Sequence, residues 1–405
     1  AAAKILVALF VALLVAVPGA GLAGQLPLTN SPLFLTVSVP SNIFFLHDDS
    51  GSMDWNLMTT QDEGIFDPGP AGCSVGNMNS GYSDPDGWWR RVYFYTHPTP
   101  GISTTASDPP TAPARNHYAN LYAPRSYMAP TEEQLIAGGV VAAPYGGVWR
   151  AWNKDYNRIY YDPAVTYKPW EGVDINGTSY SDAPAAAAPY NPFRPADGTI
   201  NLTVTTSYTT DYCPSGGATL TVSNFYPARH YTWTDNSGGT ANGVVDADDG
   251  HTLVEIISTT ASYPKAATRT DCVGTTCTYA EEIKNFANWF SYYRKRNLAA
   301  KNAIGKVIGQ AQTEVRMGHA TLNNNSGSSN VNIGVAQMNA SLSSGNKKTL
   351  LDALYKVQPS GGTPLRTKLD QTGKYFECVT GNIFGTAAPS PCPIATNASG
   401  GSCQQ

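Results

Sequence analysis

One short stretch of the sequence combines a carboxylate with two hydroxyls at a spacing suited to a hard metal ion. Asp48, Ser50 and Ser52 alternate in Asp-Asp-Ser-Gly-Ser, directly after an apolar run. Mg²⁺ binds six oxygen atoms in a nearly octahedral shell and usually keeps several water molecules. One tight turn could supply half of that shell, and Gly51 lets the backbone turn without a steric penalty. The pattern indicates a candidate metal site, but Asp and Ser also occupy ordinary turns and helix caps.

A second candidate ligand lies far along the chain, in Gly361-Gly362-Thr363-Pro364. The hydroxyl of Thr363 could reach a metal ion. Alternatively, Thr363 is only a helix N-cap, with Pro364 at the first helical position. The helix would then continue along an inner face formed by Leu365, Leu369, Thr372 and Phe376. The sequence leaves both roles of Thr363 open.

Other reactive arrangements have little support. The sequence has no Cys-x-x-Cys pair and its six histidines are scattered, which gives a zinc site no basis. We find neither a nucleophile beside a base nor a pair of acid and base carboxylates, so we do not expect an enzyme. His47 is the histidine nearest to Ser50 in sequence, and we expect it to pack in the interior. A metal-dependent hydrolase is therefore the weakest of the functions considered.

Regular elements must bring the two hydroxyl-bearing loops together. Residues 41–47 form a short, continuously apolar run, typical of a buried strand that ends at Asp48. After residue 279, the spacing of the apolar residues predicts one helix over 283–311 and strands over 315–322 and 331–338. It then predicts helices over 350–357 and 365–376. This order predicts an α/β sheet. Open α/β sheets place their ligands at the carboxyl ends of the strands, where Asp48 would lie.

A long insertion separates the first strand from the first helix. Residues 60–278 are rich in Pro, Gly, Asn, Tyr and Thr and show few helical periods. Thr199–Tyr208 and Ala218–Phe225 alternate in the manner of β-strands. The segment exceeds ordinary loop length, so we expect a β-rich insertion.

The N-terminus predicts export. Lys4 precedes 13 apolar residues, Ile5–Val17, and small residues at Gly21 and Ala23 suit a cleavage site. We interpret residues 1–23 as a signal peptide, because the apolar run is too short to span a bilayer stably. A buried helix or an uncleaved anchor is the alternative. The net charge of −4 argues against a nucleic-acid binder that works by bulk phosphate attraction.

The seven cysteines fit an oxidising compartment. Cys272 and Cys277 are close enough in sequence to close a local disulfide, and Gly274 between them permits the tight loop. The pairing of the others stays open: Cys73, Cys213, Cys378, Cys392 and Cys403.

The sequence Asn42–Met53 resembles the first strand and metal-ion-dependent adhesion site of von Willebrand factor A domains, and Gly361–Leu365 resembles the second loop of that site. The resemblance implies a Rossmann-like sheet in which Ser50 and Ser52 ligate the metal directly. Asp48 would act directly or through water, and Thr363 would be the distal hydroxyl. It implies Mg²⁺, with Mn²⁺ or Ca²⁺ as alternatives. The family's further Asp, after its fourth strand, has no counterpart up to Gln405, so the expected sheet is incomplete at its C-terminus.

Three segments resemble PilY-type adhesins of the type IV pilus tip: Tyr160–Trp170, Cys272–Arg296 and Leu369–Phe376. The resemblance implies a secreted binding module of a Gram-negative bacterium, exported through the periplasm to the cell surface or pilus tip. It would act in pilus biogenesis, surface attachment and twitching motility. Its partners would be minor pilins and a receptor with an acidic group, with no nucleic acid and no membrane span after signal cleavage. The alternative is a structural assembly or force-sensing cap without metal-dependent binding.

These observations give an expected domain organisation. A signal peptide covers residues 1–23, and a lead segment with the first strand and metal loop covers 24–59. The β-rich insertion covers 60–278, and the remainder of the A-like domain covers 279–405, ending before its fourth strand.

Overall fold

The computed structural model describes residues 41–54, 58, 65–66, 92–93, 152–211, 219–235, 239–240, 250–324 and 331–388. All of them except Ser41 belong to one unit, Asn42–Gln405. The predicted signal peptide, the lead up to residue 40, and Cys73, Cys213, Cys392 and Cys403 lie outside the described residues. Among the helices that are described, none has the length and apolar character needed to cross a bilayer.

A three-stranded mixed sheet carries the first loop. Strand β1 (Asn42–His47) pairs in parallel with β12 (Arg316–Thr321), and β12 pairs antiparallel with β13 (Ile333–Gln337). Within the described residues β1 is an edge strand of this sheet. The three predicted strands are confirmed. Gly318 lies at the irregularity in β12, where a Cβ atom would come within 2.9 Å of the Ile333 carbonyl, so a larger residue would push the strands apart.

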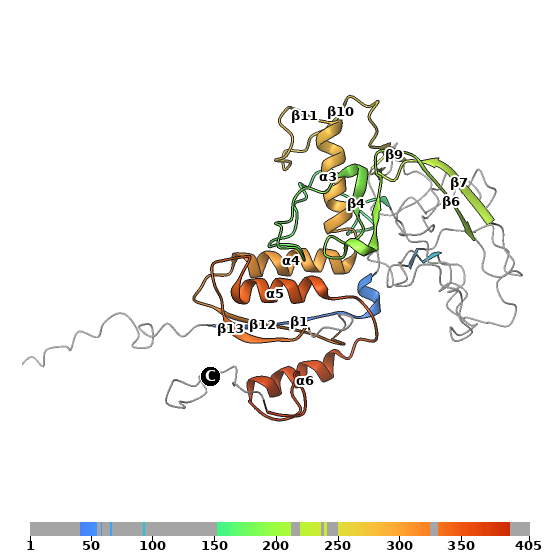
Figure 1. Cartoon of the computed structure of the whole chain (residues 1–405). Helices are drawn as coiled ribbons and strands as arrows, with labels where there is room; N and C mark the ends of the chain where they lie inside the picture. Colours follow the sequence, from blue (N-terminus) through green and yellow to red (C-terminus); the bar gives the residue numbers. More distant parts are fainter. Residues whose placement is uncertain are drawn as a thin grey trace, which may run out of the picture. The chain divides into compact units, whose positions relative to one another are not determined.

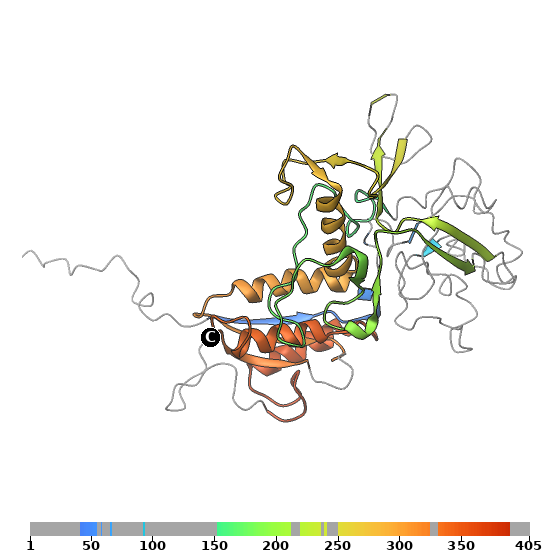
Figure 2. The same ribbon diagram turned by 45° about the horizontal axis from the view of Figure 1, so that its top comes forward.

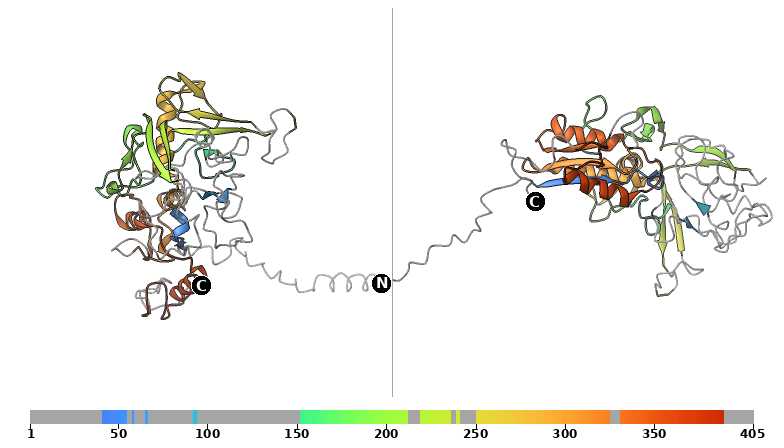
Figure 3. Two further views of the ribbon diagram at one scale, coloured as in Figure 1. Left: turned by 90° about the vertical axis from the view of Figure 1, so that its right-hand side faces the viewer. Right: turned by 90° about the horizontal axis from the view of Figure 1, so that it is seen from below.

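Helices cover both faces of this sheet. Helices α4 (Arg296–Gln310) and α5 (Gly345–Lys356) lie on one face and α6 (Leu365–Phe376) on the other (Figure 1). The right-hand view of Figure 3 looks onto the α6 side. On β1, Phe44 and Leu46 pack toward Tyr375, while Ile43 and Phe45 pack into the larger core on the opposite face. Burial on both faces explains why β1 reads as a continuous apolar run.

The single helix predicted over 283–311 is wrong. The structure has two helices, α3 (Tyr279–Tyr292) and α4, which run in different directions (Figure 2). The N–H groups of Tyr293 and Arg294 both donate to the Trp289 carbonyl, which ends α3. Buried Arg294 then lies 4.3 Å from the Phe290 ring and donates to the Phe290 carbonyl. The apolar spacing continues through the break because each helix buries a face of its own.

The described part of the insertion consists of hairpins and short helical turns. The hairpins pair β2 (Ile65–Phe66) with β3 (Val92–Tyr93), β4 (Ala188–Pro189) with β5 (Thr199–Ile200), β6 (Thr206–Asp211) with β7 (Thr219–Phe225), β8 (Arg229–Thr234) with β9 (Gly250–Glu255), and β10 (Ser262–Pro264) with β11 (Thr276–Thr278). The 3₁₀ turns are η8 (Ala185–Ala187) and η9 (Pro195–Asp197). The continuous strand predicted over Thr199–Tyr208 is wrong, because Asn201 Oδ1 accepts the N–H and the hydroxyl of Thr203 and turns the chain. Strand β7 confirms the strand predicted over Ala218–Phe225.

The insertion and the helices share one core. The ring of Trp170 stacks on Tyr355 of α5 at 4.5 Å between centroids, and the Trp170 indole donates to the Tyr292 carbonyl of α3. The Tyr355 hydroxyl donates to the Glu171 carbonyl. These contacts join residues that are at least 122 positions apart, so this part of the insertion packs as an integral layer over α3 and α5.

A buried ionic network fixes the insertion to α3. Glu282 accepts hydrogen bonds from the Tyr161 hydroxyl at 2.6 Å and from Arg269 Nη1 at 2.9 Å. Arg269 also donates to both carboxylate oxygens of Asp271. Burial and the charge of Glu282 raise the pKa of Tyr161 well above its usual value, so this hydroxyl stays protonated as a donor. Asn285 adds donors to the Tyr161 hydroxyl and the Val165 carbonyl.

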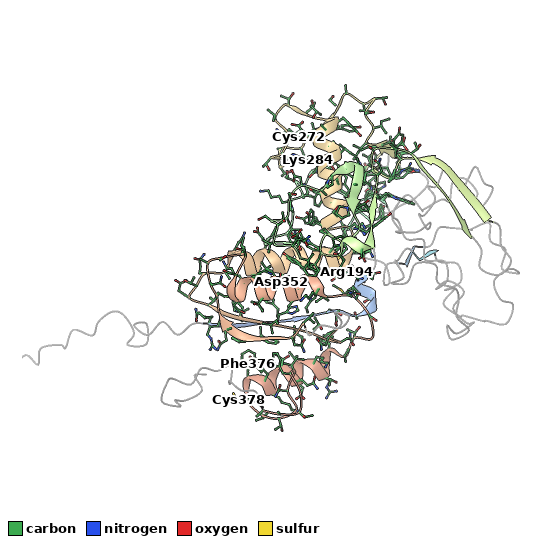
Figure 4. The ribbon with its side chains drawn as sticks, viewed as in Figure 1. Arg194, Cys272, Lys284, Asp352, Phe376 and Cys378 are labelled. Carbon is green, nitrogen blue, oxygen red and sulfur yellow. A yellow bond between two sulfur atoms is a disulfide. The ribbon has the colours of Figure 1, made fainter. Side chains whose placement is uncertain are left out.

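The predicted Cys272–Cys277 disulfide is present. It closes the loop that leads into α3 (Figure 4), and a capping box between Thr278 and Glu281 starts the helix. Cys378 is also disulfide-bonded.

Candidate functional site

The first hydroxyl-bearing loop lies where β1 ends. The strand stops at His47, and the chain turns through Asp48–Ser50 into the short 3₁₀ helix η2 (Gly51–Asp54). The second loop connects α5 to α6. Two backbone hydrogen bonds join the loops: Gly51 N–H donates to the Gly361 carbonyl at 3.0 Å, and Ser360 N–H donates to the Asp49 carbonyl at 2.7 Å. The two segments predicted to form one site are therefore neighbours in space.

The side chains of the first loop converge. Ser50 Oγ and Ser52 Oγ are 3.2 Å apart, and Asp48 Oδ1 accepts the Ser50 N–H at 2.8 Å. Neighbouring oxygens around an octahedral Mg²⁺ are about 3 Å apart, given metal–oxygen distances near 2.1 Å. The two hydroxyls therefore already have a separation that one ion could bridge. Ser50 is buried, while Asp48 and Ser52 are partly exposed.

The donor set fits a hard cation but is poor in charge. Asp48 is the carboxylate placed beside the serine hydroxyls. Across the residues that the structure describes, no group of three or more His, Cys, Asp or Glu side chains is arranged to hold a metal. Because Mg²⁺ gives up its water reluctantly, a site of this composition needs a further anionic oxygen.

Thr363 does not cap the following helix. Helix α6 begins at Leu365, Pro364 occupies the capping position, and no side chain caps the helix. The N-cap interpretation of Thr363, with Pro364 at the first helical position, is therefore wrong. The Thr363 carbonyl accepts the Leu365 N–H at 2.8 Å, which tightens the turn before the helix. Thr363 is exposed, so its hydroxyl is accessible to a ligand.

The predicted inner face of α6 is only half correct. Thr372 is buried, but Leu365 and Leu369 are 54% and 63% exposed. The helix contacts the sheet near its C-terminus, where Tyr375 and Phe376 meet the Phe44 ring. The apolar side chains in the first two turns of α6, which we expected to be buried, are therefore exposed.

Two polar residues outside the predicted set of metal ligands connect the loops. Asp49 is fully buried, and its Oδ1 accepts both the backbone N–H and the side-chain amide of Asn323. The same amide donates to the Gly362 carbonyl at 2.8 Å. The only signals in the sequence are the position of Asp49 inside the motif and that of Asn323 just after a predicted strand.

Buried polar side chains lie beneath the first loop. His47 packs inside, as expected, with its ring 5.7 Å from that of His319, whose Nδ1 lies 3.0 Å from the Val331 carbonyl. Lys301 of α4 donates to the carbonyls of Tyr355 and Val357 at the end of α5, and burial lowers its pKa to about 7. Lys295 pairs with Asp54 of η2 at 2.8 Å. The Lys295–Asp54 pair therefore ties η2 to the start of α4, while Lys301 joins α4 to the end of α5.

Acid should destabilise the fold through its buried histidines. Burial lowers the pKa of both His230 and His319 to about 4. Between that value and the ordinary 6.5, the unfolded chain binds more protons than the folded one, so stability falls as the pH drops from 6.5 towards 4. Each histidine can contribute up to about 1.4 kcal/mol per pH unit. Denaturant unfolding should show a lower midpoint at pH 5 than at pH 7, and a His319→Gln variant should reduce the difference; equal midpoints would contradict the assignment.

The chain is similar in sequence to Type IV pilus biogenesis factor PilY1 of Pseudomonas aeruginosa. The identity is 24% over 229 residues for strain UCBPP-PA14, 26% over 238 for strain PAK and 26% over 251 for strain PAO1. These matches cover 56%, 56% and 58% of this chain, but only 18% of each relative. No family model matches the sequence, and no solved structure matches the fold. The chain is therefore PilY-like over part of its length, with a mixed α/β fold.

Proposed function

We propose that this chain is a binding module of a type IV pilus-associated protein, and that a divalent metal held by Asp48, Ser50, Ser52 and Thr363 captures an acidic group on a partner. The observation that carries the proposal is the pair of backbone hydrogen bonds that holds the Asp48–Ser52 loop against the loop of Thr363. The exposed Thr363 hydroxyl adds support.

Each of the four residues would have a separate role in holding the metal. A bound metal would offer an open position to a ligand carboxylate, a strong charge-assisted contact. Ser50 and Ser52 would hold the ion from below, Thr363 from the second loop, and Asp48 would supply negative charge. Mg²⁺ suits the oxygen donors best, and Mn²⁺ or Ca²⁺ could replace it. The sheet would be that of a von Willebrand factor A domain, a family whose site includes a further Asp after the fourth strand.

The proposed setting follows from the similarity to PilY1. The module would be exported through the periplasm to the cell surface or pilus tip, contact minor pilins, and act in pilus biogenesis, attachment and twitching motility. A second function is a structural cap for assembly or force sensing without metal-dependent binding. The observation that favours this second function is the core that the insertion shares with α3 and α5, because a continuous core can transmit force between these segments.

A cellular experiment separates the two functions. Bacteria that carry Asp48→Ala in this protein should attach to surfaces less well, as should wild-type cells treated with a chelator, while the number of surface pili stays the same. Asp370→Ala, which removes an exposed carboxylate of α6, is the matched control and should attach normally. Loss of pili in the Asp48→Ala strain, with attachment per pilus unchanged, would favour the structural cap and reject the metal-dependent function.

A further inference from the structure

Three chain segments meet at the candidate site through one side chain. Asn323 follows β12, Asp49 lies in the loop after β1, and Gly362 lies in the loop before α6. The Asn323 amide nitrogen is 3.1 Å from Asp49 Oδ1 and 2.8 Å from the Gly362 carbonyl. The Asn323 backbone N–H donates to the same Asp49 oxygen at 2.8 Å. We infer that Asn323 is a positioning residue that holds the Thr363 loop against the Asp48–Ser52 loop.

The chemistry of this link requires an amide. The NH₂ group of asparagine has two hydrogens, which suit two separate acceptors. Asp49 is fully buried, and a buried carboxylate needs donors to replace the water that it has lost. An aspartate at position 323 would bring a second negative charge against Asp49 and could not donate to Gly362. The link therefore tolerates neither a carboxylate nor an apolar side chain.

The backbone of the second loop is shaped to receive this side chain. Gly361 has a φ of +85°, and a Cβ atom there would come within 3.2 Å of the Asn323 side chain. Glycine adopts this conformation without strain. The close approach lets the Gly361 carbonyl accept the Gly51 N–H while the Gly362 carbonyl accepts the Asn323 amide. Two adjacent carbonyls of the second loop thus accept hydrogen bonds, one from the loop that follows β1 and one from the segment that follows β12.

The consequence for the site rests on the proposed function. Thr363 directly follows Gly362, so release of the Gly362 carbonyl would free the segment that carries the distal hydroxyl. Residues that orient metal ligands typically change metal affinity by about 10- to 100-fold when they are replaced. Asn323 touches neither the serine hydroxyls nor Asp48, so its removal should weaken metal binding without removing a ligand.

The test combines hydrogen exchange with Mg²⁺ titration. In Asn323→Ala, the amides of Ser360 and Gly51, which bond across the loops, should exchange faster than in the wild type. Mg²⁺ affinity should fall about tenfold or more, measured in a version extended past Gln405 by the Asp-bearing strand that the resemblance implies. Asn323→Ser keeps one side-chain donor and should show intermediate exchange rates and Mg²⁺ affinity. It also provides a second variant in case Asn323→Ala does not fold. Asn324→Gly is the matched control, because the Asn324 side chain accepts the Val331 N–H instead of contacting either loop.

The outcomes are distinct. Unchanged exchange at Ser360 and Gly51 in Asn323→Ala would overturn the positioning role, and so would faster exchange with unchanged Mg²⁺ affinity. If the extended wild-type protein binds no Mg²⁺, the proposed metal-dependent function fails, and the exchange comparison alone then decides whether Asn323 holds the loops.

Discussion

Replacing Glu282 with alanine should lower the free energy of unfolding by about 3–5 kcal/mol, the usual cost of removing one partner from a buried ion pair. The Arg269 and Glu282 side chains are 0% and 1% exposed. Without Glu282, the Tyr161 hydroxyl loses its acceptor, and Arg269 keeps Asp271 as its carboxylate partner. The effect should reach Tyr160–Trp170, since the Tyr161 hydroxyl is one of the groups through which that segment binds α3. Denaturant unfolding followed by tryptophan fluorescence measures the change.

The matched control lies on the same helix. Lys284, labelled in Figure 4, pairs with Asp182 at 3.6 Å, and the two side chains are 43% and 51% exposed. Exposed pairs contribute about 0–1 kcal/mol, so Lys284→Ala should leave the unfolding midpoint nearly unchanged. Equal losses for Glu282→Ala and Lys284→Ala would show that the buried network does not hold the insertion.

Replacing Asp48 should abolish measurable Mg²⁺ binding in the extended version of the protein. Asp48 supplies the carboxylate of the first loop, and neutral hydroxyls alone offset little of the cost of dehydrating Mg²⁺. Asp48→Asn is the sharper variant, because its amide oxygen can still accept the Ser50 N–H while the charge is lost. Isothermal titration calorimetry with MgCl₂ measures the change.

The control for this variant is Asp370→Ala, which removes a carboxylate far from the first loop in sequence and 61% exposed. It should bind Mg²⁺ as the wild type does. Undiminished Mg²⁺ affinity in Asp48→Asn would show that this carboxylate does not serve a metal.

Local patterns predicted the parts of the fold that depend on burial over a few residues. The apolar run 41–47 became β1, and the strands predicted over 315–322 and 331–338 became β12 and β13. The loop motif was also readable, because its residues are adjacent in the chain. The disulfide followed from a short spacing between Cys272 and Cys277.

The features that the sequence did not predict depend on contacts between distant residues. The break between α3 and α4 follows from how Arg294 packs on Phe290. The spacing of apolar residues is the same with or without this break and therefore does not predict it. The exposure of Leu365 and Leu369 depends on what covers α6. Asn323 and Asp49 are 274 positions apart, and only the pairing of β1 with β12 brings them together.

A calorimetric Mg²⁺ titration of three proteins would show whether the Asp48–Ser52 loop and the Thr363 loop form a metal site. They are the 405-residue chain, the version extended past Gln405, and that version with both Ser50→Ala and Ser52→Ala. We expect weak binding by the 405-residue chain, in which Asp48 is the carboxylate beside the hydroxyls and β1 has a free edge among the described strands. We expect clear binding by the extended version and its loss in the double variant. Equal affinity of the first two proteins, or a double variant that binds as tightly as its parent, would contradict the proposed metal site.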